Sequence, residues 1–381
     1  MSEIVFANGR IVLPDSLVEG AVIVRDGVIV DIDEGRKHVG GADIDLGGDW
    51  LLPGLVELHT DHLEGHYSPR PKVRWNPVAA VQAHDAQIAT SGITTVFDAV
   101  RVGVDEDTRL TAEDMKTMGA AIGASMVADR LRADHYIHLR CEVSAADAIE
   151  CFMHFIGEPR VRLASLMDHT PGQRQFTSLD AFRTYYGGKS GMSEDELQAF
   201  IERRTSQAEI HSAPNRREIA EMCRARGIVL ASHDDATSEH VAEAVGMGVS
   251  LAEFPTTMEA ARASRAAGMK ILMGAPNIVR GGSHSGNIAA SDLAEDDLLD
   301  VLSSDYFPSS LLHSVFRIAA ESDQVTLPQA VAMVSSNPAQ SAGFDDRGAI
   351  EPGKRADLVQ VNMDSDIPLI LSVWRQGRRV A

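Results

Sequence analysis

The stretch GIVLASHDDATSEHVAEAVGMGVSLAEFPTT, residues 227–257, contains the pattern that decides the fold. Gly227 and Gly248 each follow a helix-like segment, and glycine readily adopts the left-handed conformation that ends a helix. Each glycine leads an apolar run that closes in polar residues. Such continuous apolar runs are typical of strands buried on both faces of a parallel sheet. The stretch therefore predicts two parallel strands joined by a helix.

The same pattern recurs along the middle of the chain. The predicted strands lie in residues 51–61, 93–100, 136–143, 161–169, 228–235, 249–257, 269–277 and 298–306. Eight such strands with intervening helices are what a closed barrel requires, so we predict an α/β protein built on a (β/α)8 TIM barrel. An open doubly wound sheet is the alternative, but the sequence contains no glycine-rich dinucleotide-binding motif.

The two ends of the chain have a different sequence pattern from the middle. Short β-rich segments occur in the first fifty and last forty residues, and Asn8-Gly9 and Asp26-Gly27 are typical of hairpin turns. Chain termini often lie close together. We therefore expect residues 1–52 and 345–381 to form a small composite β-domain, and residues 53–344 to form the barrel.

Composition limits the classes of function. The chain has 381 residues and a formal net charge of −20, which argues against nucleic acid as a partner because phosphate backbones are bound by basic surfaces. Three cysteines are too few for a disulfide framework. We find no signal-peptide pattern and no run of 18 apolar residues. These features predict a cytoplasmic protein without a membrane partner.

Histidine and acidic residues gather where the predicted strands end. They are His59, Asp61, Glu142, Asp168, His169, His233, Asp234, Asp235 and Asp305. The carboxyl ends of barrel strands meet at one mouth, where active sites of such barrels lie. His59 and Asp61 share one face of a strand. Imidazoles and carboxylates together suit a divalent metal ion, whereas a single strand-end histidine or a paired acid before a helix is commonly structural.

Several motifs carry a resemblance to a known family. PGLVELHTD and NPAQSAGFDDRGAIEPGKRADLV resemble the amidohydrolase superfamily. HTDHLEGHYSPRPKVRW, SLMDHTPGQRQF, ASHDDAT, MGAPNIVRGGSHSGN and SSDYFP resemble its phosphonate-metabolism branch in the carbon–phosphorus lyase pathway. The resemblance implies a metal-dependent hydrolase that cleaves α-D-ribose 1-methylphosphonate 5-triphosphate to the 5-phosphate and pyrophosphate.

The resemblance also implies roles for individual residues. The metal ligands would be His59, Asp61, Glu142, His169, His233 and Asp305. Asp305 would in addition take the proton of the attacking water, as the catalytic residue. Glu64 and Asp234 are second-tier candidates, as ligands or as partners that orient an imidazole. The superfamily's first pair is usually His-x-His, and Asp61 replaces the second histidine. The expected cofactor is one or two divalent ions of zinc, manganese or iron.

Basic residues near the strand ends are candidates for binding the phosphates of a small phosphorylated sugar. They are Arg70, Lys72, Arg74, Arg174, Arg280 and His284. Arginine suits bidentate phosphate contacts, although loop cations are often plain surface charge. Two alternatives stay open: hydrolysis or deamination of a cyclic amide-type substrate, and a catalytically silent barrel that serves as a scaffold. A homo-oligomer is compatible with the sequence.

Overall fold

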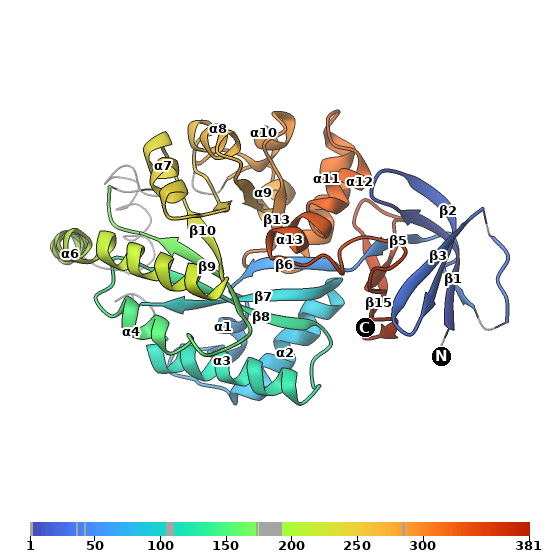
Figure 1. The fold of residues 1–381 in the computed structure, drawn as a ribbon, viewed down its shortest axis with the longest axis horizontal. Helices are drawn as coiled ribbons and strands as arrows, with labels where there is room; N and C mark the ends of the chain where they lie inside the picture. Colours follow the sequence, from blue (N-terminus) through green and yellow to red (C-terminus); the bar gives the residue numbers. More distant parts are fainter. Residues whose placement is uncertain are drawn as a thin grey trace.

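The barrel and a second sheet lie side by side in the computed structural model, which describes residues 3–35, 37–41, 43–103, 110–172, 174, 193–283 and 286–381 (Figure 1). The barrel strands are β6 (Leu55–Thr60), β7 (Ile93–Val102), β8 (Asp134–Glu142), β9 (Val161–Met167), β10 (Val229–His233), β11 (Leu251–Glu253), β12 (Lys270–Gly274) and β13 (Val301–Ser303). They pair in parallel in chain order, and a parallel bridge between Thr60 and Asp305 joins the last strand to the first. The predicted eight-stranded barrel is confirmed.

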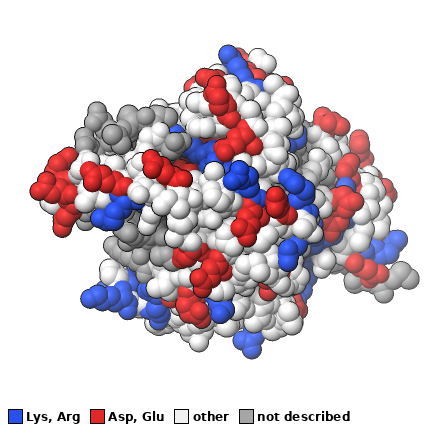
Figure 2. All heavy atoms as spheres, turned by 60° about the vertical axis from the view of Figure 1, so that its left-hand side comes forward, with Lys and Arg blue, Asp and Glu red and all other residues white. Residues whose placement is uncertain are grey.

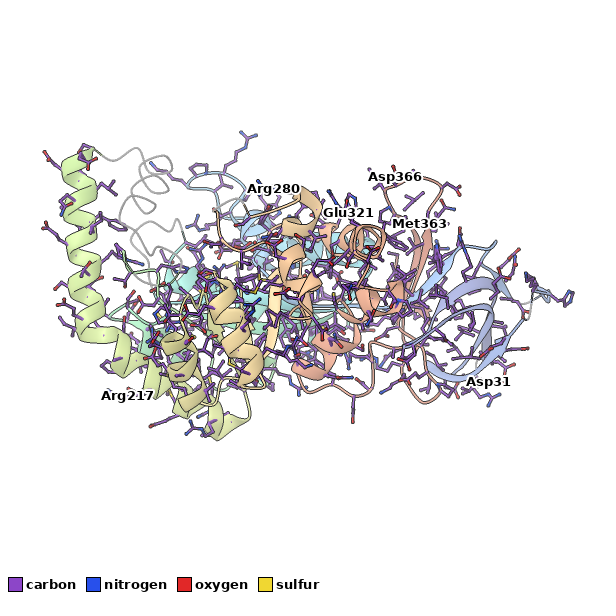
Figure 3. All side chains as sticks on the ribbon, turned by 90° about the horizontal axis from the view of Figure 1, so that it is seen from above. Asp31, Arg217, Arg280, Glu321, Met363 and Asp366 are labelled. Atoms are coloured by element: carbon purple, nitrogen blue, oxygen red, sulfur yellow. The ribbon has the colours of Figure 1, made fainter. Side chains whose placement is uncertain are left out.

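Helices cover the outside of the barrel. They are α1 (Leu63–Tyr67), α2 (Pro77–Thr90), α3 (Ala112–Val127), α4 (Ala148–Met153), α6 (Glu194–Arg226), α7 (Ser238–Gly246), α8 (Met258–Ala266), α9 (Ala275–Arg280), α10 (Ala290–Glu295), α11 (Ser310–Glu321), α12 (Leu327–Ala332) and α13 (Ser336–Ser341). The 33-residue α6 begins at a Ser193–Glu196 capping box and ends at Gly227, whose φ is 66°. It lies at the end of the molecule opposite the second sheet (Figures 1 and 3).

The second sheet combines both ends of the chain. Its strands are β1 (Glu3–Val12), β2 (Leu17–Arg25), β3 (Val28–Glu34), β4 (Ile44–Asp45), β5 (Trp50–Pro53), β14 (Leu358–Asn362), β15 (Leu369–Arg375) and β16 (Arg378–Arg379). The central order is β14-β5-β1-β2, so the N- and C-terminal segments interleave. The predicted composite sheet is therefore present, and its core cluster includes Phe6, Leu51 and Trp374.

One predicted turn in this sheet is wrong. Asn8-Gly9 does not form a hairpin but lies inside β1, where the register with β2 shifts between Phe6 and Gly9. Asn8 has a φ of 59°, as expected of the residue at a β-bulge. The Asp26-Gly27 turn does join β2 to β3, with both residues at positive φ. An Asn-Gly pair supplies the same backbone freedom to a bulge as to a hairpin, which explains the error.

The barrel interior determines which residues reach its mouth. Phe97, Leu163, Ala231, Leu251, Leu272 and Val301, each from a different strand, belong to one buried cluster. Because side chains alternate along a strand, the residue two positions later points to the same side. That places Ser165, His233 and Glu253 directly above Leu163, Ala231 and Leu251. The apolar layer therefore supports a polar layer at the carboxyl ends of the strands.

Candidate metal centre and active site

A buried carboxylate links two of the predicted metal ligands. Glu253, at the end of β11, faces His59 on β6 and His233 on β10. Its Oε1 lies 3.2 Å from Nδ1 of His59, and its Oε2 lies 3.1 Å from Nδ1 of His233. All three side chains are at most 7% exposed. Burial opposes ionisation of Glu253, but His59 and the hydrogen bonds from His233 and His59 hold its pKa well below the usual range.

Two further side chains complete the surroundings of Glu253. Ser165 Oγ donates to Glu253 Oε2 at 2.5 Å. His138 on β8 contacts Ser165 through Nε2 and donates from Nδ1 to the Leu58 carbonyl at 3.0 Å. Burial lowers the pKa of His138 to about 3, so this imidazole is neutral at physiological pH. The polar layer is thus a connected hydrogen-bond network with Glu253 at its centre.

These hydrogen bonds set the tautomers of the histidines. In the neutral form of His59 and of His233, Nδ1 donates to Glu253 and Nε2 keeps its lone pair. His169 follows the same rule, because its Nδ1 lies 2.7 Å from Glu142 Oε2. Histidines that ligate metals commonly donate their other nitrogen to a carboxylate in this way. Three imidazoles at the mouth therefore present Nε2 as a donor atom for a metal ion.

Glu142 is held firmly at the end of β8. Ser144 Oγ donates to its Oε1 at 2.5 Å, and the Arg204 guanidinium on α6 lies 4.0 Å away. Burial acts to raise the pKa of Glu142, but His169 and Arg204 outweigh it and lower the pKa to about 2. The carboxylate is therefore ionised at neutral pH, as a metal ligand must be.

Asp61 and Asp305 lie next to each other where the barrel closes. The Asp305 backbone N–H donates to the His59 carbonyl at 3.1 Å, and the Asp61 N–H donates to the Asp305 carbonyl at 3.3 Å. The Arg140 guanidinium donates to Asp61 Oδ2 at 3.2 Å. Burial raises the pKa of Asp305, and the negative charge of Asp61 adds to the rise. Asp305 has a φ of 55°, a conformation that non-glycine residues rarely adopt.

The two second-tier candidates lie at different distances from the histidines. Asp234 has a φ of 57°, and its Oδ2 lies 3.5 Å from Nε2 of His233 and 3.8 Å from Nε2 of His169. Glu64 instead accepts from Arg101 at 3.0 Å, and burial raises its pKa. Asp234 thus lies among the potential ligands, whereas Glu64 forms an ion pair with Arg101.

Two of the predicted phosphate-binding arginines form ion pairs within the protein. Arg74 makes a two-pronged pair with Asp114, at 2.9 Å for each contact. Arg174 is 5% exposed and pairs with Asp235 and with Glu243, the latter at 3.1 Å. Glu243 also accepts from Arg216. These cations are neutralised by nearby carboxylates.

The other basic candidates are more accessible. Arg70 and Lys72 are exposed in the segment after α1, and Arg280 is exposed at the end of α9 (Figure 3). None of these three forms an ion pair with a residue in the described part of the chain. His284 lies outside the described residues. Figure 2 shows Lys and Arg interspersed with Asp and Glu on the face that it draws, rather than a broad basic field.

The structure adds two residues that sequence reasoning missed, Glu253 and His138. Glu253 stands at the end of the apolar run VSLAE, the same kind of position as the residues that were singled out. Its position as an acidic residue at the end of a predicted strand could therefore have identified it from the sequence. His138 lies in the middle of the run YIHLRCEV, where only the alternation of side chains places it on the inner face.

The donor set fits a divalent metal ion. One ligand atom each of His169, His233 and Asp234 lies within 4.8 Å of the others, and the same holds for His59, His138 and Glu253. Imidazole and carboxylate donors without thiolates suit zinc, manganese and iron. The free cysteines Cys141, Cys151 and Cys223 are buried, and none belongs to this donor set.

Comparison with known proteins agrees with this geometry. The family model described as "Amidohydrolase family" matches residues 50–380. The chain belongs to the amidohydrolase family. It is a close homologue of the α-D-ribose 1-methylphosphonate 5-triphosphate diphosphatase of Escherichia coli (strain K12), with 49% identity over 98% of this chain and 99% of that protein. An adenine deaminase of Nitratidesulfovibrio vulgaris (strain DP4) is 25% identical over 100% of this chain and 58% of its own length.

Solved structures share the amidohydrolase fold. A dihydropyrimidinase from Brevibacillus agri NCHU1002 superposes with a TM-score of 0.62 at 12% identity, covering 99% of this chain and 95% of that one. An N-acetylglucosamine-6-phosphate deacetylase from Pasteurella multocida gives a TM-score of 0.60 at 15% identity, with 99% of each chain covered. At these identities the likeness establishes the fold of barrel plus composite sheet.

Proposed function

We propose that this amidohydrolase is a metal-dependent diphosphatase that hydrolyses α-D-ribose 1-methylphosphonate 5-triphosphate to the 5-phosphate and pyrophosphate. The observation that carries the proposal is the 49% identity to the E. coli diphosphatase along almost the whole of both chains. The histidines and carboxylates assembled at the barrel mouth supply the polar chemistry that phosphoanhydride hydrolysis needs.

The metal ligands that we propose are His59, Asp61, Glu142, His169, His233 and Asp305. Three of them present Nε2 because their Nδ1 atoms face carboxylates. A divalent ion, when bound, polarises a phosphoryl oxygen and makes water more acidic. Zinc, manganese and iron are the candidates, as one ion or two. Asp234 is positioned to join the set or to orient His169 and His233.

Asp305 is the residue that we propose for proton transfer. Water attacks the sugar-proximal phosphorus, the bond from that phosphorus to the oxygen of the leaving pyrophosphate breaks, and the proton of the water passes to the Asp305 carboxylate. The backbone bonds between Asp305, His59 and Asp61 hold this carboxylate beside the ligands. Its position at the junction of the first and last strands fits that role.

Arg70, Lys72 and Arg280 are proposed to bind the phosphates directly, since their side chains are exposed and unpaired within the described residues. Developing negative charge on the leaving pyrophosphate is stabilised by such cations. Arg74 and Arg174 are proposed to contribute through their ion pairs, which fix the loops around the mouth. His284 remains a candidate from the sequence.

We also propose the substrate class, the cellular location and the domain division of the enzyme. The proposed substrate is a small phosphorylated sugar, and the composition fits a cytoplasmic enzyme and is compatible with a homo-oligomer. No helix in the described ranges is both long enough and apolar enough to cross a membrane. The proposed division assigns residues 53–344 to the catalytic barrel, and residues 1–52 and 345–381 to the composite domain.

Comparing turnover on two substrate classes tests the proposed function. Purified protein reconstituted with zinc, manganese or iron is incubated with the ribose methylphosphonate triphosphate, and pyrophosphate release is measured. Adenine and hydantoin are offered in parallel. Release of pyrophosphate with no turnover of adenine or hydantoin supports the proposal, whereas turnover of either alone assigns the chain to ordinary amide or deaminase chemistry.

A further inference from the structure

Three histidines outside the candidate active site form a second cluster of potential ligands. His62 is the residue directly before α1, and His66 lies within α1. His84 lies on α2. One nitrogen of each ring lies within 4.8 Å of the others. The ring centroids form a nearly regular triangle, at 5.0 Å for His62–His66 and 5.9 Å for each of the two distances to His84.

The nitrogens in this cluster are buried without hydrogen-bond partners. His62 Nδ1, His66 Nε2 and His84 Nδ1 make no hydrogen bond with any described residue. Buried polar atoms are normally paired, so one unpaired nitrogen on each of three neighbouring rings needs an explanation. A ligand that accepts electron pairs satisfies all three at once.

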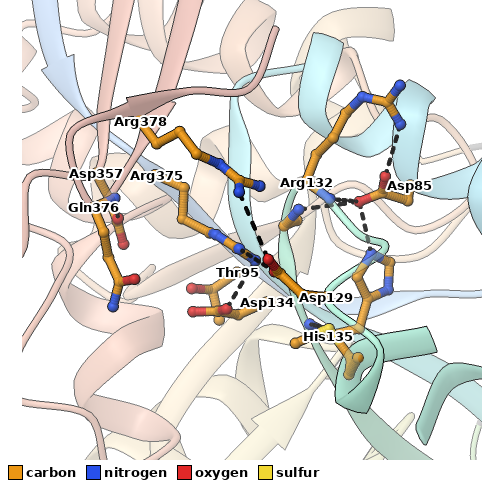
Figure 4. A network of polar contacts seen from close by, with 12 residues as sticks. Asp85, Thr95, Asp129, Arg132, Asp134, His135, Asp357, Arg375, Gln376 and Arg378 are labelled. Atoms are coloured by element: carbon orange, nitrogen blue, oxygen red, sulfur yellow. Dashed lines mark hydrogen bonds and ion pairs between the residues drawn. The ribbon is translucent and has the colours of Figure 1, made fainter. Parts of the chain in front are cut away.

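His84 is held in the form that a metal ion requires. Its side chain is 0% exposed, and its Nε2 lies 2.7 Å from Asp98 Oδ1. Because Nε2 donates to that carboxylate, Nδ1 of the neutral ring carries a lone pair, and this atom is buried without a hydrogen-bond partner among the described residues. Asp98 is fixed in turn by His135 Nδ1 at 2.7 Å, and His135 also contacts Asp85 (Figure 4). A carboxylate behind a ligating histidine is the usual arrangement of a protein metal site.

The spacing of the other two histidines suits a shared ligand. His62 and His66 are four residues apart, which places them on the same face of a helical turn. Both are partly exposed, so their rings have room to turn toward a common centre. In a tetrahedral zinc site with bonds of about 2.0–2.1 Å, ligand nitrogens lie about 3.4 Å apart. Small rotations therefore bring the three nitrogens to bonding distance.

We propose that His62, His66 and His84 form a second metal site, which binds a zinc-like divalent ion through three imidazole nitrogens and fastens α1 to α2. Three protein ligands leave the fourth position of a tetrahedral ion to water. The site is separate from the donors around Glu253 and does not depend on the proposed hydrolysis. Its occupancy stabilises the segment that carries Arg70 and Lys72 from α1 to α2.

Metal stoichiometry tests this site apart from the active site. Zinc per chain is measured by mass spectrometry after equilibrium dialysis of the wild type, His66→Gln and His154→Gln, the last an exposed histidine on the C-terminal side of α4. The same comparison is made in a His233→Ala background, which weakens binding at the barrel mouth. Circular dichroism establishes that each variant is folded.

The expected result is the loss of about one zinc equivalent per chain in His66→Gln, in both backgrounds, with no loss in His154→Gln. Cobalt substitution provides a second readout, because the tetrahedral cobalt absorption of this site disappears with His66→Gln and with the less conservative His62→Ala. Equal zinc content in the wild type and His66→Gln, with both proteins folded, overturns the proposal. Failure of pyrophosphate release leaves this result unaffected, so the two proposals are tested independently.

Discussion

The imidazole rings of His59 and His233 stack with their centroids 5.7 Å apart, and the Nδ1 atoms of both rings face the same Glu253 carboxylate. One acid on β11 thus orients two proposed metal ligands, which lie on β6 and β10. The tautomers that follow from this arrangement expose both Nε2 atoms. We therefore propose Glu253 as a positioning residue that contributes to metal binding rather than to the reacting atoms.

Replacing Glu253 with glutamine is expected to weaken metal binding about 10- to 100-fold, the usual effect of removing a partner behind a ligand. A glutamine side chain can donate as well as accept, so it no longer specifies which nitrogen of His59 and His233 carries the proton. Metal titration of the apoprotein measures the change. Glu259→Gln, at an exposed position on α8, is the matched control. Unchanged affinity in a folded Glu253→Gln variant contradicts the positioning role.

Removing the charges of Arg70 and Lys72 together, by changing both to alanine, is expected to raise KM for the triphosphate roughly 10-fold or more, because each charge-assisted hydrogen bond contributes about 1.5–3 kcal/mol. Both side chains are exposed, so the melting temperature should stay the same. Steady-state pyrophosphate release gives KM and kcat. Lys116→Ala, at an exposed position on α3, is the control. A wild-type KM in the double variant would exclude these cations from binding.

Asp134 joins the barrel to the composite sheet through three arginines. Its carboxylate lies 2.8 Å from Arg355 and 3.1 Å from Arg347. It also lies 3.1 Å from Arg375 (Figure 4). Burial acts to raise the pKa of Asp134, but Arg355 and Arg375 outweigh it and lower the pKa below its ordinary 3.8. The stabilisation is therefore present above pH 3.8 and is lost as the pH falls through the lowered pKa.

Asp134→Asn is expected to reduce the free energy of unfolding by about 3 kcal/mol at pH 7, because it removes the buried carboxylate that Arg347, Arg355 and Arg375 share. The loss should shrink toward acid pH, where Asp134 is protonated in the wild type as well. Urea unfolding between pH 3 and pH 7 measures both effects. Asp129→Asn, whose side chain is 71% exposed, should change stability by less than about 0.5 kcal/mol. A loss that is constant with pH would show that the charge of Asp134 is not responsible.

Gly54 separates β5 in the composite sheet from β6 in the barrel. A Cβ at this position would lie 2.7 Å from Thr94 Cγ2 and 2.9 Å from Asp357 Cβ. The Gly54 N–H also donates to the Asp357 carbonyl at 2.7 Å, so the backbone cannot move away freely. Gly54→Ala is expected to destabilise the protein by about 1–3 kcal/mol, as overpacking does.

Thermal unfolding of the purified Gly54→Ala variant checks this expectation, with Gly157→Ala as the control, since no atom lies within 4 Å of a Cβ at position 157. Equal melting temperatures for the two variants would mean that the junction between β5 and β6 tolerates a side chain. A lower melting temperature for Gly54→Ala alone supports close packing at the junction.

The fold could be predicted from the sequence because its signals are local and repeated. Glycine-led apolar runs mark each barrel strand, and the carboxyl ends of such strands must meet. The same logic predicted that His59, His169 and His233 would converge. The bulge at Asn8-Gly9 could not be predicted, because only the paired strand decides whether this dipeptide turns the chain or shifts its register.

The ion pairs of Arg174 and the cluster of His62, His66 and His84 could not be predicted, because they depend on contacts between separate segments of the chain. Arg174 was a reasonable phosphate ligand from its loop position, but the fold places Asp235 and Glu243 against it. The sequence alone does not single out the second histidine cluster. His62 and His66 follow the proposed ligand Asp61 in the same motif, and His84 lies in an apolar helix. Only the packing of α1 against α2 brings their nitrogens together.

In the mechanism that we propose, metal held at the barrel mouth supports triphosphate hydrolysis with Asp305 as proton acceptor. Pyrophosphate release from α-D-ribose 1-methylphosphonate 5-triphosphate is the most direct test, measured for the metal-depleted protein, the reconstituted protein and reconstituted Asp305→Asn. We predict activity only in the reconstituted wild type, and a loss of at least 100-fold in a folded Asp305→Asn, in line with removal of a general acid–base group. Equal pyrophosphate release by the metal-depleted wild type, or by Asp305→Asn, would contradict the account.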